Sequence, residues 1–322
     1  MRSISRRDFV QAPALALGLA GCACRRAANR QPAGETPVSV VRAQDYGQRL
    51  YGEVRRLIGA HGLKVKGKRV LLKPNLVEFE PDSCINTHPL LVHAVLEAFR
   101  AMGAQVAIGE GPGHRRNTLD LADAAGYFQT IPGFENLFID LNLDEVAHIR
   151  LNQPHSRLGS VYVARSAMAC DLLVSIPKMK THHWAGATLS MKNLFGTVSG
   201  GVYGWPKNVL HWAGIPECIA DLHRALPAHF AIVDGIVGMQ GNGPIQGKAK
   251  RAGVLVAGRD LRAVDSTCCQ IMSIDPDRIA YLRLALADAG GDAPAIRQIG
   301  ESVESVRTRF ELIPEWNRIR LG

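Results

Sequence analysis

One short segment of the chain, KMKTHHWAGATLSMKNLFGTVSG at residues 178–200, concentrates side chains that can bind charge. It contains Lys178, Lys180 and Lys192, and no carboxylate lies among them. An ammonium group that leaves water needs a counter-charge. A lysine-rich segment without acids therefore favours a site for a phosphate or carboxylate ligand. The alternative is a solvated loop whose lysines simply face water.

The same segment also carries two adjacent histidines, His182 and His183. In an extended stretch alternate side chains share a face, so Lys178, Lys180 and His182 are expected to point the same way. His182, or a lysine whose pKa burial has lowered, is then a candidate for moving a proton. His183 is a candidate metal ligand. Because neighbouring side chains in a strand point oppositely, at most one of the two histidines is expected to fit easily.

The elements that must position these groups are short apolar runs separated by amphipathic stretches. Strands are predicted near residue 38 and at 69–73, 104–109, 136–141, 171–176, 229–234 and 252–257. Helices are predicted at 89–103, 215–226 and 275–290, where apolar residues recur at three- and four-residue spacing. Continuous apolar strands alternating with helices indicate a mostly parallel, Rossmann-like sheet covered on both faces, in one large α/β domain.

In such folds ligands bind outside the carboxyl ends of the strands. Lys73 ends the strand at 69–73 and Asn75 follows it, and Lys192 and Asn193 lie in the later part of the lysine-rich segment, at the predicted start of a helix. These four residues are predicted to bind an anionic ligand or cofactor. The central expectation is that the ammonium groups of residues 73, 178, 180 and 192 meet at one rim.

Glycine-rich segments follow two of the strands. GEGPGHRRNT at 109–118 is predicted to turn into a helix capped by Asn117. Glu110 in it is either a functional acid or a loop charge. GIVGMQGNGPIQGK at 235–248 is predicted to be neither helix nor strand. Its Gly241, Asn242 and Gly243 are candidate ligand contacts.

Two aspartates and one further histidine complete the candidates. Asp234 ends a strand and is predicted to bind a metal or orient a lysine, unless it only caps a turn. Asp265 stands among apolar neighbours in a probable helix, and a buried carboxylate needs a cation or donors, so it is predicted to pair with a site lysine. His211 precedes a helix and is either a metal ligand in the same crevice or an ordinary core histidine.

The N-terminal residues predict export. The stretch SRRDFV at 5–10 fits the twin-arginine signal pattern, and the apolar stretch after it is too short to span a bilayer. Leu19-Ala20-Gly21-Cys22 resembles a lipobox, which predicts cleavage after residue 21 and a lipid anchor on Cys22; an ordinary signal with a chance cysteine is the alternative. Residues 22–36 are predicted to be a flexible tether, and 37–322 a single domain on the periplasmic side of a membrane.

The composition excludes some other functions. The formal net charge of +9 falls to +7 without residues 1–21, which hold three arginines and one aspartate. There is no lysine- and arginine-rich run with interleaved aromatics, so nucleic acid is not an expected partner. No Cys-x-x-Cys is present. An iron–sulfur cluster and a structural zinc site are therefore not expected.

Several motifs together resemble a known family. They are Lys73-Pro74-Asn75, Pro177-Lys178-Met179-Lys180-Thr181-His182, Ser190-Met191-Lys192-Asn193-Leu194-Phe195-Gly196, Val233-Asp234-Gly235, Gly238-Met239-Gln240-Gly241-Asn242-Gly243-Pro244 and Ala263-Val264-Asp265. Their order and spacing, from about residue 69 to 290, are similar to the domain-of-unknown-function 362 family. The resemblance implies a single α/β domain and, in many members, an export signal. It implies no general activity, and the cysteine clusters of its iron–sulfur members are missing here.

Two functional hypotheses follow from the sequence. The first is an exported enzyme that acts on an anionic small molecule or a bound cofactor, with a phosphorylated molecule or a divalent metal as the cofactor. Lys178, Lys180, His182 and Asp265 would do the chemistry. The second is a lipoprotein that captures an anionic ligand or a metal in the same crevice without any reaction.

Overall fold

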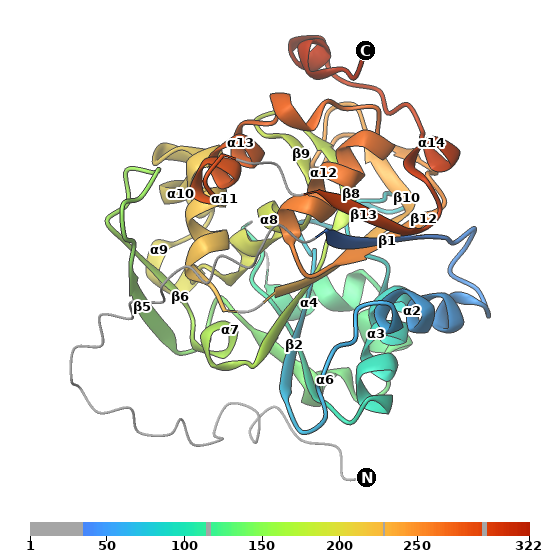
Figure 1. The fold of residues 1–322 in the computed structure, drawn as a ribbon. Helices are drawn as coiled ribbons and strands as arrows, with labels where there is room; N and C mark the ends of the chain where they lie inside the picture. The colour runs from blue at the N-terminus through green and yellow to red at the C-terminus, as the bar shows by residue number, and fades with distance from the viewer. Residues whose placement is uncertain (1–34, 114–116, 228, 292–294) are drawn as a thin grey trace.

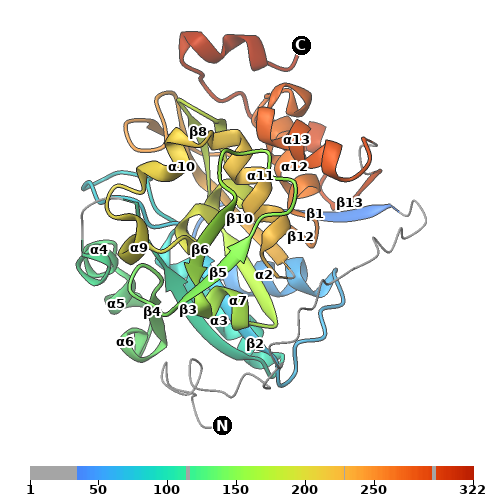
Figure 2. The same ribbon diagram turned by 90° about the vertical axis from the view of Figure 1, so that its left-hand side faces the viewer.

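The computed structural model describes residues 35–113, 117–227, 229–291 and 295–322. The predicted signal peptide, Cys22 and nearly all of the predicted tether lie outside the described residues. Within them, an eleven-stranded sheet runs through the centre of the molecule, and helices pack on both sides of it (Figures 1 and 2).

The main path of the sheet has the order β13-β1-β12-β10-β7-β2-β3-β4. β10, β7, β2, β3 and β4 run parallel to one another, whereas β12 is antiparallel to both of its neighbours, β1 and β10. The predicted mostly parallel α/β sheet is confirmed. These strands are β1 (Thr36–Arg42), β2 (Arg69–Pro74), β3 (Gln105–Glu110), β4 (Phe138–Asp140), β7 (Leu172–Ile176), β10 (His229–Gln240), β12 (Val254–Gly258) and β13 (Ile296–Gly300).

Successive residues of a central strand enter opposite cores because side chains alternate across a sheet. In β2, Val70 and Leu72 join one apolar cluster and Leu71 joins the other. The first cluster is covered by α2 (Leu50–Gly59), α3 (Pro89–Ala101), α4 (Thr118–Ala124), α5 (Tyr127–Thr130) and α6 (Phe134–Leu137). The second is covered by α7 (Arg165–Ala169), α8 (Ser190–Asn193), α10 (Asn208–Trp212), α11 (Ile215–Ala225), α12 (Leu261–Ile271), α13 (Ala280–Asp288) and α14 (Val303–Val306).

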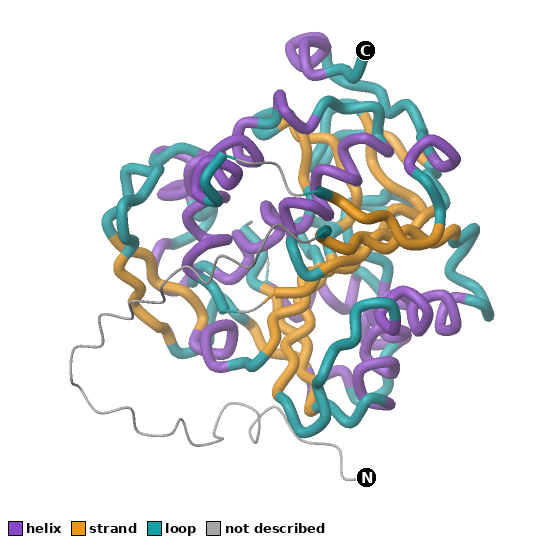
Figure 3. The backbone as a smooth tube through the Cα atoms, viewed as in Figure 1, coloured by secondary structure: helices purple, strands orange, loops and turns teal. Residues whose placement is uncertain are grey.

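Shorter elements complete the chain. Asn117 caps α4 by accepting hydrogen bonds from the amides of Leu119 and Asp120, as predicted. The segment between β4 and β7 is not part of the main sheet but forms a separate antiparallel hairpin (Figure 3). The remaining elements are β5 (Val146–Arg150), β6 (Ser160–Ala164), β8 (Lys178–His182), β9 (Gly186–Thr188), β11 (Lys248–Lys250), α9 (Gly200–Tyr203), η1 (Leu194–Thr197), η2 (Pro276–Arg278) and η3 (Pro314–Ile319).

The prediction that residues 235–248 contain no strand is wrong for the first part of that segment. β10 continues through residue 240, and its glycines make room for neighbouring chain. A Cβ on Gly235 would lie 2.9 Å from Met179 Cε, and one on Gly238 would lie 2.6 Å from the Met179 carbonyl oxygen. These glycines permit close packing against β8 rather than a turn.

The helix predicted at residues 275–290 is interrupted. Pro276 begins the short 3₁₀ helix η2, and Ile279 then adopts an extended backbone before α13 starts at Ala280. None of the helices in the described ranges is both long and apolar enough to cross a bilayer.

Candidate functional site

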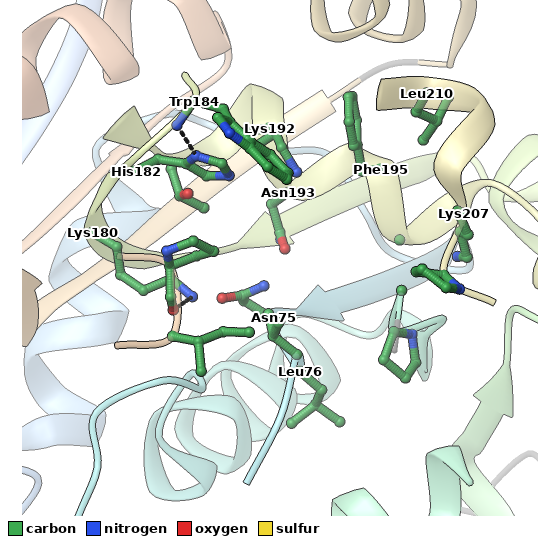
Figure 4. A pocket seen from close by; sticks show the side chains of 18 of the residues that line it. Asn75, Leu76, Lys180, His182, Trp184, Lys192, Asn193, Phe195, Lys207 and Leu210 are labelled. Atoms are coloured by element: carbon green, nitrogen blue, oxygen red, sulfur yellow. Dashed lines mark hydrogen bonds between the residues drawn. The ribbon is translucent and has the colours of Figure 1, made fainter. Parts of the chain in front are cut away.

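A cavity of about 380 Å³ opens at the carboxyl ends of β2, β3 and β7 (Figure 4). Its wall comes from the segments that follow these strands, from β8, α8 and η1, and from the residues around α10. The cavity therefore lies at the edge of the sheet where parallel-sheet proteins bind ligands, as the sequence predicted.

A buried ion pair forms one side of the cavity. Lys73 Nζ lies 2.8 Å from both carboxylate oxygens of Glu110, and each side chain is only 1% exposed. Lys73 Nζ also donates to Asn193 Oδ1 at 3.2 Å, and Asn193 Nδ2 donates to the Lys73 carbonyl oxygen at 3.0 Å. Glu110, which the sequence left open as either an acid or a loop charge, is thus the counter-ion of Lys73.

Gly196 lets the backbone approach this pair. A Cβ at this position would lie 1.9 Å from Glu110 Oε1 and 2.5 Å from Lys73 Nζ. Any larger residue would have to displace one of the two charged groups. Glycine is therefore required at position 196 because the packing there is close, not because the chain turns there.

Lys180 and Lys192 also line this cavity, and neither has a carboxylate partner within the described part of the chain. Lys180 Nζ donates to the carbonyl oxygens of Ile85 at 2.9 Å and Pro244 at 3.2 Å. Burial, followed by repulsion from Lys192 and Lys178, lowers the pKa of Lys180 to about 7. Burial and the nearby Lys73 ammonium lower the pKa of Lys192 to about 7 as well.

Lys207 is a fourth cavity lysine that the sequence analysis missed. Its Nζ donates to the Gly111 carbonyl oxygen at 2.7 Å, and burial lowers its pKa to about 7. The signal was present, because the stretch YGWPKNVLHW around it also contains no acid. Figure 4 shows Lys180 and Lys207 at opposite sides of the cavity, with Asn75 and Asn193 between them.

The two histidines offer different ring nitrogens to the cavity. His182 Nδ1 accepts from the amides of Trp184 at 3.0 Å and Ala185 at 3.3 Å, so its proton sits on Nε2. Burial and the neighbouring cations hold the pKa of His182 well below its usual range. His183 Nδ1 donates to the Gly243 carbonyl oxygen at 2.7 Å, which leaves its Nε2 as an acceptor. Both histidines line the cavity, because His183 lies in the turn after β8 rather than in the strand.

Two buried oxygens in the wall have no partner among the described residues. They are Asn75 Oδ1 and Thr188 Oγ1, on residues that are 7% and 4% exposed. An unpaired buried polar atom costs free energy, so such atoms at a cavity wall indicate that a bound molecule or water completes them.

The glycine-rich loop after β10 contributes unevenly. Asn242 lines the cavity, whereas Gly241 and Gly243 do not. The Gly241 carbonyl oxygen accepts from Thr181 Oγ1, and a Cβ on Gly243 would lie 2.1 Å from the Thr181 carbonyl oxygen. These two glycines hold the loop against β8.

Lys178 lies away from the cavity, so the predicted meeting of four lysines holds for only three of them. Lys178 and Asp234 are paired across β8 and β10, and Lys178 Nζ lies 2.7 Å from Asp234 Oδ2. Tyr46 and the amide of His88 also donate to Asp234. Asp234 therefore orients a lysine, which is one of its two predicted roles.

The predicted metal ligands do not come together. His183 and His211 line the cavity, but Asp234 is buried beside Lys178. Among the residues that the structure describes, no three His, Cys, Asp or Glu side chains form a group that could hold a metal ion.

Asp265 pairs with no lysine in the described structure, so that prediction is wrong. It is fully buried and accepts from the amides of Ser190 at 2.8 Å and Met191 at 3.1 Å, and also from the hydroxyls of Ser190 and Tyr281. These donors replace the expected cation. Asp265 thus fixes the first turn of α8, which carries Lys192.

The chain is similar to a protein family and to individual known proteins. The model of the domain of unknown function DUF362 matches residues 70–270. The thylakoid-associated protein sll1697 of Synechocystis is 30% identical over 254 residues, which cover 75% of this chain and 76% of that protein. The lactate racemase apoprotein of Thermoanaerobacterium thermosaccharolyticum aligns with a TM-score of 0.47 and 15% identity. That alignment covers 74% of this chain and 57% of the racemase chain.

The match to the DUF362 model spans well over half of the chain and includes Lys73, Lys180, Lys192 and Asp265. The resemblance seen in the sequence motifs is confirmed. The chain belongs to the DUF362 family.

Proposed function

We propose that the cavity binds a small molecule bearing phosphate or carboxylate groups, and that the protein is an enzyme acting on it. One observation carries this proposal. Four lysines line one cavity, where Glu110 is paired with Lys73 and the other three have no carboxylate partner among the residues that the structure describes. Cations removed from water attract an anion strongly, because little solvent screens them.

The polar atoms of the wall add specificity to this charge. The side chain of Asn75 and the hydroxyl of Thr188 have oxygens without partners in the described structure, and His182 offers an N–H. A ligand with both anionic and hydrogen-bonding groups would satisfy them. A volume of about 380 Å³ also lies within the range of small-molecule sites and exceeds what a single phosphate fills.

Catalysis is favoured over simple capture by the lysines themselves. A lysine with a pKa near 7 exists both as acid and as base at neutral pH, which suits proton transfer. A capture protein would need only the charge. The ligand-binding lipoprotein remains the outcome if ligand is bound and released unchanged.

Anion binding is expected to weaken as the pH rises. Lys180, Lys192 and Lys207 are protonated below pH about 7 and lose charge above it, so the dissociation constant for oxalate should rise more than tenfold from pH about 6 to about 9. Calorimetric titration at several pH values measures this change. Oxalate is suitable because its own charge stays constant over this range.

Two variants locate the binding. Lys180→Met should weaken oxalate binding about tenfold or more at pH 6, whereas Lys64→Met on an exposed loop should leave it unchanged. Equal oxalate affinity in the natural chain, Lys180→Met and Lys64→Met, or an oxalate affinity that does not change with pH, would contradict the proposed site.

We also propose that the protein is exported and held at a membrane by a lipid on Cys22. The sequence supports this through the SRRDFV pattern and the lipobox-like residues 19–22. The relative named as thylakoid-associated adds support for association with a membrane.

The anchor is tested by fractionation of the exporting host. The full chain should sediment with membranes, and Cys22→Ala should move most of it into the soluble periplasmic fraction. Replacing Arg6 and Arg7 with lysine should instead retain the precursor in the cytoplasm. Membrane association that survives Cys22→Ala would count against the lipid.

A further inference from the structure

The ammonium group of Lys192 differs from those of the other cavity lysines. Lys73 is paired with Glu110, Lys180 is held by two backbone carbonyl oxygens, and Lys207 donates to one. Within the described ranges, Lys192 Nζ has no hydrogen-bond acceptor, and it lies 3.9 Å from the centre of the Phe195 ring. Of the four cavity lysines, Lys192 is therefore the one whose nitrogen donates no hydrogen bond in the described structure.

The surroundings of Lys192 favour the neutral amine. The Lys73 ammonium repels a second positive charge, and burial disfavours it further. A lysine that is desolvated or placed beside another cation is a nucleophile toward carbonyl carbon, because its lone pair is available at neutral pH. Lys192 combines both features.

The position of Lys192 is also well defined. Asp265 binds the amides of Ser190 and Met191 at the start of α8, and Asn193 is tied to Lys73 on both its amide oxygen and nitrogen. The residues on each side of Lys192 are thus anchored. Lys192 lines the cavity, and its side chain is seen next to Trp184 in Figure 4.

We propose that Lys192 forms an imine with the carbonyl carbon of a ligand that also bears a carboxylate or phosphate group. This inference rests on the proposed anion site, because the remaining lysines would hold the acidic group of the same ligand. The Lys192 nitrogen attacks the carbonyl carbon and its lone pair becomes the new C–N bond. The carbonyl oxygen then leaves as water with the two protons of the amine, and a C=N bond remains.

The cavity supplies groups for both stages of this reaction. His182 Nε2–H is a donor for the carbonyl oxygen as negative charge develops there, and His183 Nε2 is an acceptor for a proton from the attacking amine. The Lys180 ammonium is the acid that protonates the departing oxygen. No oxidant, reductant or metal is needed.

Reductive trapping tests the proposal on the full mature chain. The protein is incubated with glyoxylate, pyruvate or pyridoxal 5′-phosphate, then reduced with borohydride, and the adduct is located by peptide mass spectrometry. We expect one adduct per chain on Lys192, at least about tenfold above any exposed lysine, since exposed lysines are almost fully protonated at neutral pH. It should also exceed the adducts on Lys180 and Lys207, because the nitrogens of these two already donate to carbonyl oxygens. Acetone, which lacks the acidic group, should give far less adduct.

At ligand concentrations that keep the site saturated, the yield of adduct should rise as the pH passes through about 7, opposite to the trend for oxalate affinity. Lys192→Arg keeps a positive charge and should remove the adduct. Mapping on the unmodified chain does not depend on how that variant folds. Adducts spread over exposed lysines such as Lys64, or absent altogether while oxalate still binds, would overturn the imine and leave the anion site standing. Loss of oxalate binding in the unmodified protein would overturn the anion site itself.

Discussion

Lys73→Met is expected to lower the free energy of unfolding by about 3–5 kcal/mol. The substitution leaves Glu110 buried with only two donors from the described ranges, the amides of Leu76 at 3.1 Å and Gly111 at 2.8 Å. An ionised carboxylate that is 1% exposed cannot recover this loss from water. Urea denaturation of the purified domain measures the change.

The Lys73–Glu110 ion pair as a whole is expected to contribute much less to the free energy of unfolding than either single substitution indicates. Lys73→Met combined with Glu110→Leu should cost less than the sum of the two single variants, because no unpaired charge remains. Arg165→Met is the control, since Arg165 and Glu145 lie 2.8 Å apart but have side chains 55% and 69% exposed. It should cost at most about 1 kcal/mol. A cost for Lys73→Met no greater than that of the control would show that Glu110 is not held as an ion.

Asp265→Ala is expected to have a similarly large effect, about 3–5 kcal/mol, for a different reason. It removes the acceptor for the Ser190 and Met191 amides and for two hydroxyls, all within the core. Asp265→Asn keeps one acceptor oxygen and should cost less. The control is Asp260→Ala at the start of the same helix, which removes a helix cap that contributes about 1 kcal/mol and a partly exposed ion pair with Arg262 that contributes about 1 kcal/mol or less.

Asp265→Ala should also change ligand binding in the cavity. Asp265 does not line the cavity, yet Lys192 stands in the turn that Asp265 anchors, so oxalate affinity and the Lys192 adduct should both fall in Asp265→Ala. Calorimetry and peptide mapping measure them. Unchanged binding in a destabilised but folded variant would limit Asp265 to a role in stability.

The pH dependence of stability gives an independent check on Asp265. Burial raises its pKa to about 7, against an ordinary value of 3.8 in the unfolded chain. The folded state therefore holds a proton that the unfolded state has lost between these values, and this stabilisation is lost as the pH rises through about 7. The stability of the natural chain relative to Asp265→Asn should fall over that interval.

The sequence alone was sufficient for the sheet and for the edge at which the cavity lies. The continuous apolar runs predicted the strands, and the lysines and asparagines at or after the ends of such strands were recognisable from their types. Lys73, Asn75, Lys180, Lys192 and Asn193 do line one cavity. These features could be predicted because periodicity is local, and parallel strands present their carboxyl ends at one edge.

The tertiary structure alone decided which charge pairs with which. Lys178 and Lys180 lie two residues apart in the sequence. Lys178 nevertheless forms an ion pair with Asp234, which is 56 residues away, whereas in the described structure Lys180 donates only to carbonyl oxygens. Asp265 accepts hydrogen bonds from the amides of Ser190 and Met191, which lie 75 and 74 residues earlier, instead of pairing with the expected lysine. An ion pair or hydrogen bond requires an approach within about 3–4 Å, which depends on the pairing of distant strands. A one-dimensional pattern contains the charges and the order of the strands but not those distances.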